Sequence, residues 1–91
     1  MRDSIFKIRN LRFVETSIMC PEQYDVYNEN NQAIGYVRLR FGELTARLQG
    51  EEEPIYLFDF EEEYLGEFPT DDDFEFHMDK IGDAFIDALK R

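Results

Sequence analysis

Apolar and polar side chains alternate along the middle of the chain, which predicts two β-strands. Within residues 34–41, Val37, Leu39 and Phe41 alternate with Tyr36, Arg38 and Arg40, and residues 44–48 repeat the pattern. A period of two is typical of a strand with one buried face. Gly42 and Glu43 between the two runs predict a two-residue turn, so the strands would form an antiparallel hairpin. This turn would place Phe41 on the buried face.

Other apolar runs extend the same sheet. Three of them predict strands: residues 5–14, 24–27 and 55–60. The first run changes parity near Asn10, which we interpret as a β-bulge within one strand. The asparagine-rich residues 28–32 predict a turn that sets Tyr24 opposite Val37. Residues 64–68 predict either an extension of the sheet or a short extra strand.

A helix is predicted at the C-terminal end of the chain, over about residues 71–90. Its apolar positions recur three or four residues apart and form one stripe: Phe74, Met78, Ile81, Phe85 and Leu89. Thr70 and Asp73 have the spacing of a capping box. Three aspartates in the first turn match the positive end of the helix dipole. These signals predict where the helix begins.

Together the elements predict an α+β fold, with an antiparallel β-meander sheet of about five strands and one C-terminal α-helix packed on it. We expect a single domain over residues 1–91, with the sheet over about residues 4–68. A chain of this length can form one core without disulfides. Hydrophobic residues make up 43% of the chain and aromatic residues 15%, so we expect a folded protein in spite of its charge.

Charge is divided unevenly between the two halves of the chain. Residues 1–50 carry six acids and seven bases, a net charge of +1, whereas residues 51–91 carry fifteen acids and three bases, a net charge of −12, which together give −11. Residues 51–79 hold thirteen carboxylates and no lysine or arginine. They include three acidic triplets at ten-residue intervals: 51–53, 61–63 and 71–73. Such charge either keeps a protein soluble or serves a basic partner.

On a folded scaffold these carboxylates would imitate phosphates and occupy the nucleic-acid-binding surface of a target protein. Aromatic side chains between them would supply desolvated anchors. The alternative is a solvated acidic face without a partner. Direct binding to nucleic acid or to an anionic membrane is disfavoured. The residues that we expect to contact a partner are Glu51, Glu52, Glu53, Asp59, Glu61, Glu62, Glu63, Glu67, Asp71, Asp72, Asp73, Tyr64 and Phe76.

Three arginines are predicted to share the outward face of the central hairpin: Arg38, Arg40 and Arg47. The predicted turn would set Arg38 directly opposite Arg47, and like charges across a ladder repel. We therefore expect an anion near them. It would be a carboxylate of the same chain, such as one of residues 61–63, an external anion, or the acidic segment of a second copy.

Candidate catalytic and metal-binding residues are few. Cys20 and His77 are the only cysteine and the only histidine, and no catalytic signature surrounds either. The pair cannot complete a tetrahedral zinc site. Residues 71–75 lack the glycine of an EF-hand loop, which leaves only an irregular, weak cation site. The chain is also small for the substrate cleft of a glycosidase. We expect a protein that is not an enzyme and has no cofactor.

The single cysteine and the absence of a long apolar run favour a cytoplasmic protein without a signal peptide or a membrane span.

Residues 13–48, which contain the runs CPEQYD and GYVRLR, resemble short uncharacterised proteins of bacterial phages and mobile elements. In size and acidity only, the chain resembles anti-CRISPR and other anti-defence inhibitors. This resemblance implies an inhibitor that binds a basic effector such as a CRISPR nuclease. The alternative is a small structural or assembly module that forms homo-oligomers, such as a homodimer, through its sheet.

Overall fold

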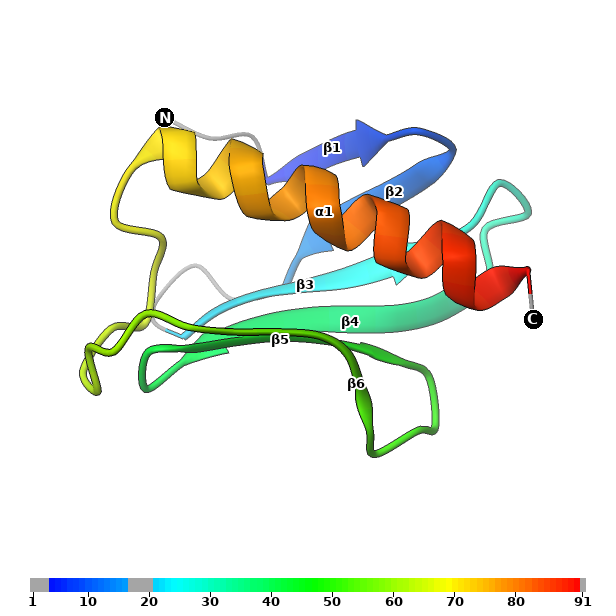
Figure 1. Ribbon diagram of the computed structural model, residues 1–91. Coiled ribbons are helices and arrows are strands. Elements are labelled where there is room, and N and C mark those ends of the chain that lie inside the picture. The colour runs from blue at the N-terminus through cyan, green and yellow to red at the C-terminus, as the bar shows by residue number, and fades with distance from the viewer. Residues whose placement is uncertain (1–3, 17–20, 91) are drawn as a thin grey trace.

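The computed structural model describes residues 4–16 and 21–90 (Figure 1). Six strands form one antiparallel sheet in which each strand pairs with the next: β1 (Ile5–Ile8), β2 (Leu11–Glu15), β3 (Glu22–Tyr27), β4 (Ala33–Arg40), β5 (Glu43–Leu48) and β6 (Pro54–Asp59). A single helix, α1 (Asp71–Leu89), lies across one face of the sheet, as Figure 1 shows. The predicted α+β meander with a C-terminal helix is confirmed, with six strands instead of about five. No helix in the described residues is long and apolar enough to cross a bilayer.

The additional strand comes from the N-terminal segment, which is a hairpin. Arg9 and Asn10 form its two-residue turn, with Arg9 at a φ of 56°. Phe6 pairs with Phe13, so both rings lie on the same face of the sheet, where they stack with centroids 5.1 Å apart. Since paired residues of a hairpin share a face, the apolar parity changes across its turn. The interpretation of this change as a bulge within one strand was wrong.

The turn between β4 and β5 consists of Phe41 and Gly42, one residue earlier than predicted. Arg40 therefore pairs with Glu43, and both turn residues have positive φ, 53° for Phe41 and 78° for Gly42. Two positive φ angles are the geometry of a type I′ hairpin turn. Phe41 is 68% exposed, so its predicted burial was wrong. Gly42 cannot be replaced without movement, because a Cβ atom there would lie 2.2 Å from the carbonyl oxygen of Glu62.

The hydrophobic core lies between the sheet and α1. Tyr24 pairs with Val37, as predicted, and both side chains are buried. The helix contributes Met78, Ile81 and Phe85 to the same core. Burying a side chain of this size stabilises the fold by about 1.5–3 kcal/mol. The core therefore fixes which face of α1 remains for solvent.

The segment between β6 and α1 has no regular structure, so the strand predicted within residues 64–68 does not form. Its backbone is attached to the end of the sheet: the N–H of Glu22 donates to the carbonyl of Gly66 at 2.7 Å, and the N–H of Gly42 donates to that of Leu65 at 2.7 Å. Phe68 enters the core. The segment is thus held on the sheet by its backbone and one aromatic side chain.

The helix begins where the capping signal predicts. Thr70 is the N-cap residue, and its side-chain oxygen accepts a hydrogen bond of 3.0 Å from the backbone N–H of Asp73. The Thr70 hydroxyl also donates to the Asp73 carboxylate at 3.0 Å. Since Asp73 makes these local contacts, it is less available to a partner than Asp71 and Asp72, which are exposed.

Candidate acidic interaction surface and arginine face

The three acidic triplets do not share one surface. Residues 51–53 lie in the loop before β6 and residues 61–63 follow the strand, so six residues of extended chain, about 20 Å, separate the two triplets. Figure 1 shows the loop before β6, in green, at the opposite end of the sheet from the segment after β6 and from the start of α1. The second and third triplets therefore share one end of the molecule, and the first does not.

We call the group at this shared end the acidic end. Its members are exposed carboxylates that follow one another from the end of β6 to the first turn of α1: Asp59, Glu61, Glu62, Glu63, Glu67, Asp71 and Asp72. Tyr64 lies among them and is 92% exposed. The structure thus brings together seven of the predicted carboxylates and one predicted aromatic residue. Glu51, Glu52 and Glu53 are exposed but lie elsewhere.

The solvent face of α1 continues the negative charge. Asp71, Glu75, Asp79, Asp83 and Asp87 are spaced by four residues, are all exposed, and are here called the acidic row. Residues four apart on a helix are neighbours, about 6 Å along the axis. Of this row only Asp71 was among the predicted contact residues. The four-residue spacing of the other members from Asp71 was the signal in the sequence that would have found them.

One arginine contacts the acidic row. The Nη2 atom of Arg9 lies 3.3 Å from Oδ1 of Asp79 and 2.7 Å from Oδ1 of Asp83. These are the two ion pairs within residues 4–16 and 21–90. Both aspartates are largely exposed, so the pairs add little stability, about 0–1 kcal/mol. No lysine or arginine of those ranges lies within 4.0 Å of a carboxylate of the acidic end.

Phe76 lies on the helix, more than half exposed, beside this row. The Nζ atom of Lys80 is 5.0 Å from the centre of its ring, a cation–π contact. The predicted aromatic contact residues are therefore both at the surface, Tyr64 at the acidic end and Phe76 on α1.

His77 lies in an aromatic cluster between β6 and α1. Its side chain is 2% exposed, and its Nδ1 atom is 2.7 Å from the hydroxyl of Tyr56. The rings of Phe58 and Phe60 lie 4.4 and 5.2 Å from its ring, centroid to centroid. The aromatic face of β6 thus contacts α1 of the same chain.

Burial lowers the pKa of His77, an effect that the neighbouring Asp73 opposes and Lys80 reinforces. Burial also raises the pKa of the Tyr56 hydroxyl. Both pKa shifts favour the uncharged forms of the two side chains, so that the protonated Tyr56 hydroxyl donates a hydrogen bond to the neutral imidazole of His77. Cys20, the other residue considered for a catalytic pair with His77, lies outside the described residues. Among the residues that the structure describes, no group of three or more His, Cys, Asp and Glu side chains is placed to hold a metal ion.

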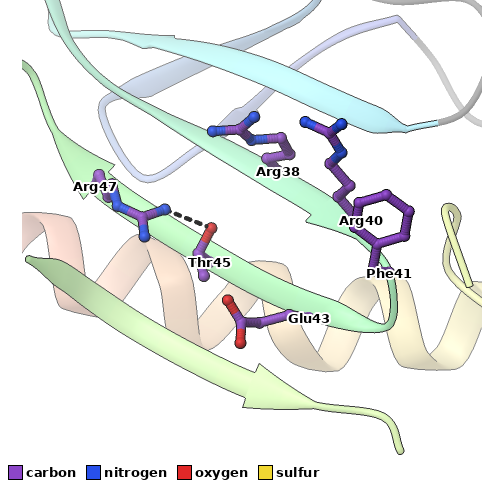
Figure 2. Close-up of a pocket in the computed structure, with 6 residues that line it drawn as sticks. All are labelled: Arg38, Arg40, Phe41, Glu43, Thr45 and Arg47. Atoms are coloured by element: carbon purple, nitrogen blue, oxygen red, sulfur yellow. Dashed lines mark hydrogen bonds between the residues drawn. The ribbon is translucent and has the colours of Figure 1, made fainter. Parts of the chain in front are cut away.

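Arg38 and Arg40 extend from β4 on the face of the sheet opposite α1, and Arg47 extends from β5 on the same face (Figure 2). Because the turn begins one residue early, Arg38 pairs with Thr45, and the predicted opposition of Arg38 and Arg47 was wrong. No carboxylate in the described part of the chain lies within 4.0 Å of these guanidinium groups. Residues 61–63 therefore do not neutralise them, contrary to the first of the three expectations.

Comparisons of the chain with protein-family models, with curated proteins and with solved structures found no match. The resemblance of residues 13–48 to phage proteins stays a prediction. The assignment of a function therefore depends on the geometry and the charge of the chain itself.

Proposed function

We propose that the protein is a non-enzymatic acidic binding protein that occupies a basic, nucleic-acid-binding surface of a target protein by imitating nucleic acid. The observation that carries this proposal is the position of the carboxylates. The acidic end and the acidic row lie on two consecutive segments of one fold, and all of their members are exposed. Within the described ranges only Asp79 and Asp83 have a cationic partner.

The spacing of the carboxylates indicates that the acidic end and the acidic row must act together to imitate nucleic acid. Duplex DNA carries one phosphate about every 3.4 Å along each strand. The acidic row presents one carboxylate about every 6 Å, so alone it matches roughly every second phosphate of one strand. The acidic end adds six carboxylates beyond Asp71, which the two groups share. The two groups together form the proposed mimic.

Salt would weaken the binding of an interface built only from charged residues, because it screens their attraction. Exposed aromatic residues add apolar contact area, which salt does not screen. Tyr64 lies among the glutamates of the acidic end, and Phe76 lies on α1 near the acidic row. Tyrosine is enriched among the residues that dominate binding energy at protein interfaces. We assign these two rings as apolar anchors of the interface.

The target class that we propose is a nucleic-acid-binding effector such as a CRISPR nuclease, whose nucleic-acid channel is positively charged. The resemblance of residues 13–48 to proteins of phages and mobile elements supports this choice, and so does the strong acidity of a small chain. A target of this class implies that the protein acts in the cytoplasm.

The chain provides a matched control for the experiment. Residues 51–53 and 61–63 are both triplets of glutamate, and they lie at opposite ends of the sheet. Replacing either triplet with lysine changes the net charge by the same amount. The protein and both variants are immobilised and tested for binding to purified RNA-guided nucleases, and to proteins captured from nuclease-treated lysate, at about 50 mM and about 200 mM salt.

We expect the variant at 61–63 to lose affinity by about tenfold or more, whereas the variant at 51–53 keeps most of it. Affinity of the unaltered protein should fall at the higher salt concentration. Equal losses in the two variants would show that only net charge matters. Affinity that does not respond to salt would reject electrostatic imitation.

A further inference from the structure

The outer face of the β4–β5 hairpin holds a site of opposite charge (Figure 2). A shallow hollow there, called here the arginine hollow, is lined by Arg38, Arg40, Phe41, Glu43, Thr45 and Arg47. The chain has 21 acidic and 10 basic residues, yet none of these arginines has a carboxylate within 4.0 Å in the described residues. Even Glu43, which pairs with Arg40 in the ladder, stays beyond that distance.

Thr45 forms the floor of the arginine hollow. It lies on the outer face of the sheet but is only 4% exposed. Its hydroxyl oxygen accepts a hydrogen bond of 2.9 Å from Nη1 of Arg47. In the described part of the chain the hydroxyl proton has no acceptor. A buried donor without an acceptor is unfavourable, so a ligand oxygen at this point would be stabilised.

Arg47 is held in place by the protein. Besides its bond to Thr45, its Nε atom donates to the backbone carbonyl of Glu52 at 2.9 Å. These two hydrogen bonds use the Nε–H and one N–H of Nη1, and they leave the remaining N–H donors for a ligand. The position of this charge is therefore set before any ligand binds, which reduces the entropy cost of binding.

Arg38 and Arg40 each make a cation–π contact with an aromatic ring. The Cζ atom of Arg38 is 5.8 Å from the centre of the Tyr36 ring, and that of Arg40 is 4.9 Å from the centre of the Phe41 ring. Such contacts hold the plane of a guanidinium group without using its N–H donors. Figure 2 shows both guanidinium groups extending from β4 in the same direction. Their planar forks match the oxygen atoms of a phosphate or carboxylate group.

We propose that the arginine hollow binds a phosphate group. Three arginines and one glutamate give the lining a charge of +2, which matches a phosphate dianion. The floor offers a hydroxyl donor to an oxygen atom. Glu43 is an acceptor in the same hollow, and it suits the single O–H of hydrogen phosphate, which sulfate lacks. A polyanion such as nucleic acid is disfavoured by the net charge of −11.

The site goes beyond the proposed function, because it uses no residue of the acidic end or the acidic row. It is tested with the whole protein labelled with ¹⁵N and titrated with inorganic phosphate at constant ionic strength, at a pH where phosphate is a dianion. We expect saturable shifts of the side-chain N–H signals of Arg38, Arg40 and Arg47 and of the amide signal of Thr45. Sulfate should bind several-fold more weakly.

A second arm uses O-phosphoserine in place of inorganic phosphate. Saturable shifts with both ligands would assign the site to phosphate esters, and saturable shifts with inorganic phosphate alone would assign it to free phosphate. Either result supports the proposal. Shifts that do not saturate with either ligand, or that chloride reproduces, would overturn it.

Variants separate a specific site from a general charge effect. Arg40→Gln should weaken phosphate binding by about tenfold, the cost of one charge-assisted hydrogen bond. The matched control is Arg12→Gln, since Arg12 lies on β2 and donates to the side chain of Asn31. The control should leave phosphate binding unchanged. Equal effects of the two variants would overturn the proposal.

Thr45→Val keeps the shape of the floor but removes its hydroxyl, and it should weaken binding several-fold. Glu43→Gln should reduce the preference for phosphate over sulfate. The ¹⁵N spectrum of each variant verifies that it is folded. Full phosphate affinity in the folded Thr45→Val protein would contradict the role assigned to the floor.

Discussion

The backbone N–H of Phe68 donates a hydrogen bond of 3.1 Å to Oε1 of Glu22, forty-six residues earlier in the chain. The other carboxylate oxygen of Glu22 accepts a hydrogen bond from the hydroxyl of Tyr24. Glu22 is a buried residue at the start of β3. This side chain thus adds to the backbone hydrogen bonds of Leu65 and Gly66, which hold on the sheet the segment that carries most of the acidic end.

Glu22→Ala should therefore destabilise the protein by about 2–4 kcal/mol. The substitution removes the acceptor of both hydrogen bonds, and each buried donor that loses its acceptor costs about 1–3 kcal/mol. Glu22→Gln keeps one carbonyl oxygen and should cost less. Urea unfolding measures the difference. A loss below about 0.5 kcal/mol for Glu22→Ala would show that the carboxylate does not hold the segment.

Stability should fall as the pH drops below the ordinary histidine pKa of 6.5. Burial lowers the pKa of His77 in the folded protein, so below that pH the unfolded chain binds a proton that the folded protein does not. The contribution is fully present above pH 6.5 and is lost as the pH falls toward the folded value. Urea unfolding between about pH 7.5 and 5 measures this loss of stability. The same measurement on His77→Gln gives the pH dependence that comes from the carboxylates, which is subtracted.

The same prediction has a direct spectroscopic form. The ring proton signals of His77 should titrate with a midpoint below 6.5. Tyr56→Phe removes the hydrogen bond to Nδ1, which favours the neutral ring, so the midpoint should rise in that variant. A midpoint at or above 6.5 in the unaltered protein would contradict the burial of a neutral imidazole.

Phe41→Asn should raise the stability of the protein by about 0.5–1 kcal/mol. Phe41 has a φ of 53°, and a left-handed conformation costs an ordinary residue about 1–2 kcal/mol, whereas asparagine followed by glycine suits a type I′ turn. The lost contact with Arg40 offsets part of the gain. Thermal unfolding monitored by circular dichroism tests this. A lower melting temperature would mean that the exposed ring makes a larger contribution than its position indicates.

Screening of charge should also stabilise the fold. With a net charge of −11, the folded chain repels itself, and salt near physiological strength reduces the Debye length to about 8 Å. The free energy of unfolding should increase between about 10 mM and 150 mM salt. A decrease would imply that ion pairs such as those of Arg9 dominate over the repulsion.

The sequence was sufficient for the fold class, the start of α1 and the pairing of Tyr24 with Val37, because alternation, capping and turn signals agreed at those places. It misplaced the β4–β5 turn because a phenylalanine at positive φ goes against local preference. The irregular segment before α1 depends on hydrogen bonds to residues far away in sequence, and local patterns do not show these.

The candidate surfaces were predictable only in part. The division of the triplets between two ends follows from the strand predicted between residues 53 and 61. The face of Arg38, Arg40 and Arg47 followed from their parity. The role of Thr45 did not follow from its parity. Its burial depends on the packing of the long side chains of neighbouring arginines over a face that alternation marks as exposed.

The most direct test of the central claim is a competition between this protein and duplex DNA for one target that binds the protein. We predict that the two exclude each other, so that the apparent dissociation constant of the protein increases linearly with the concentration of DNA. A ternary complex of target, DNA and protein, with an affinity for the protein that DNA does not change, would contradict the claim.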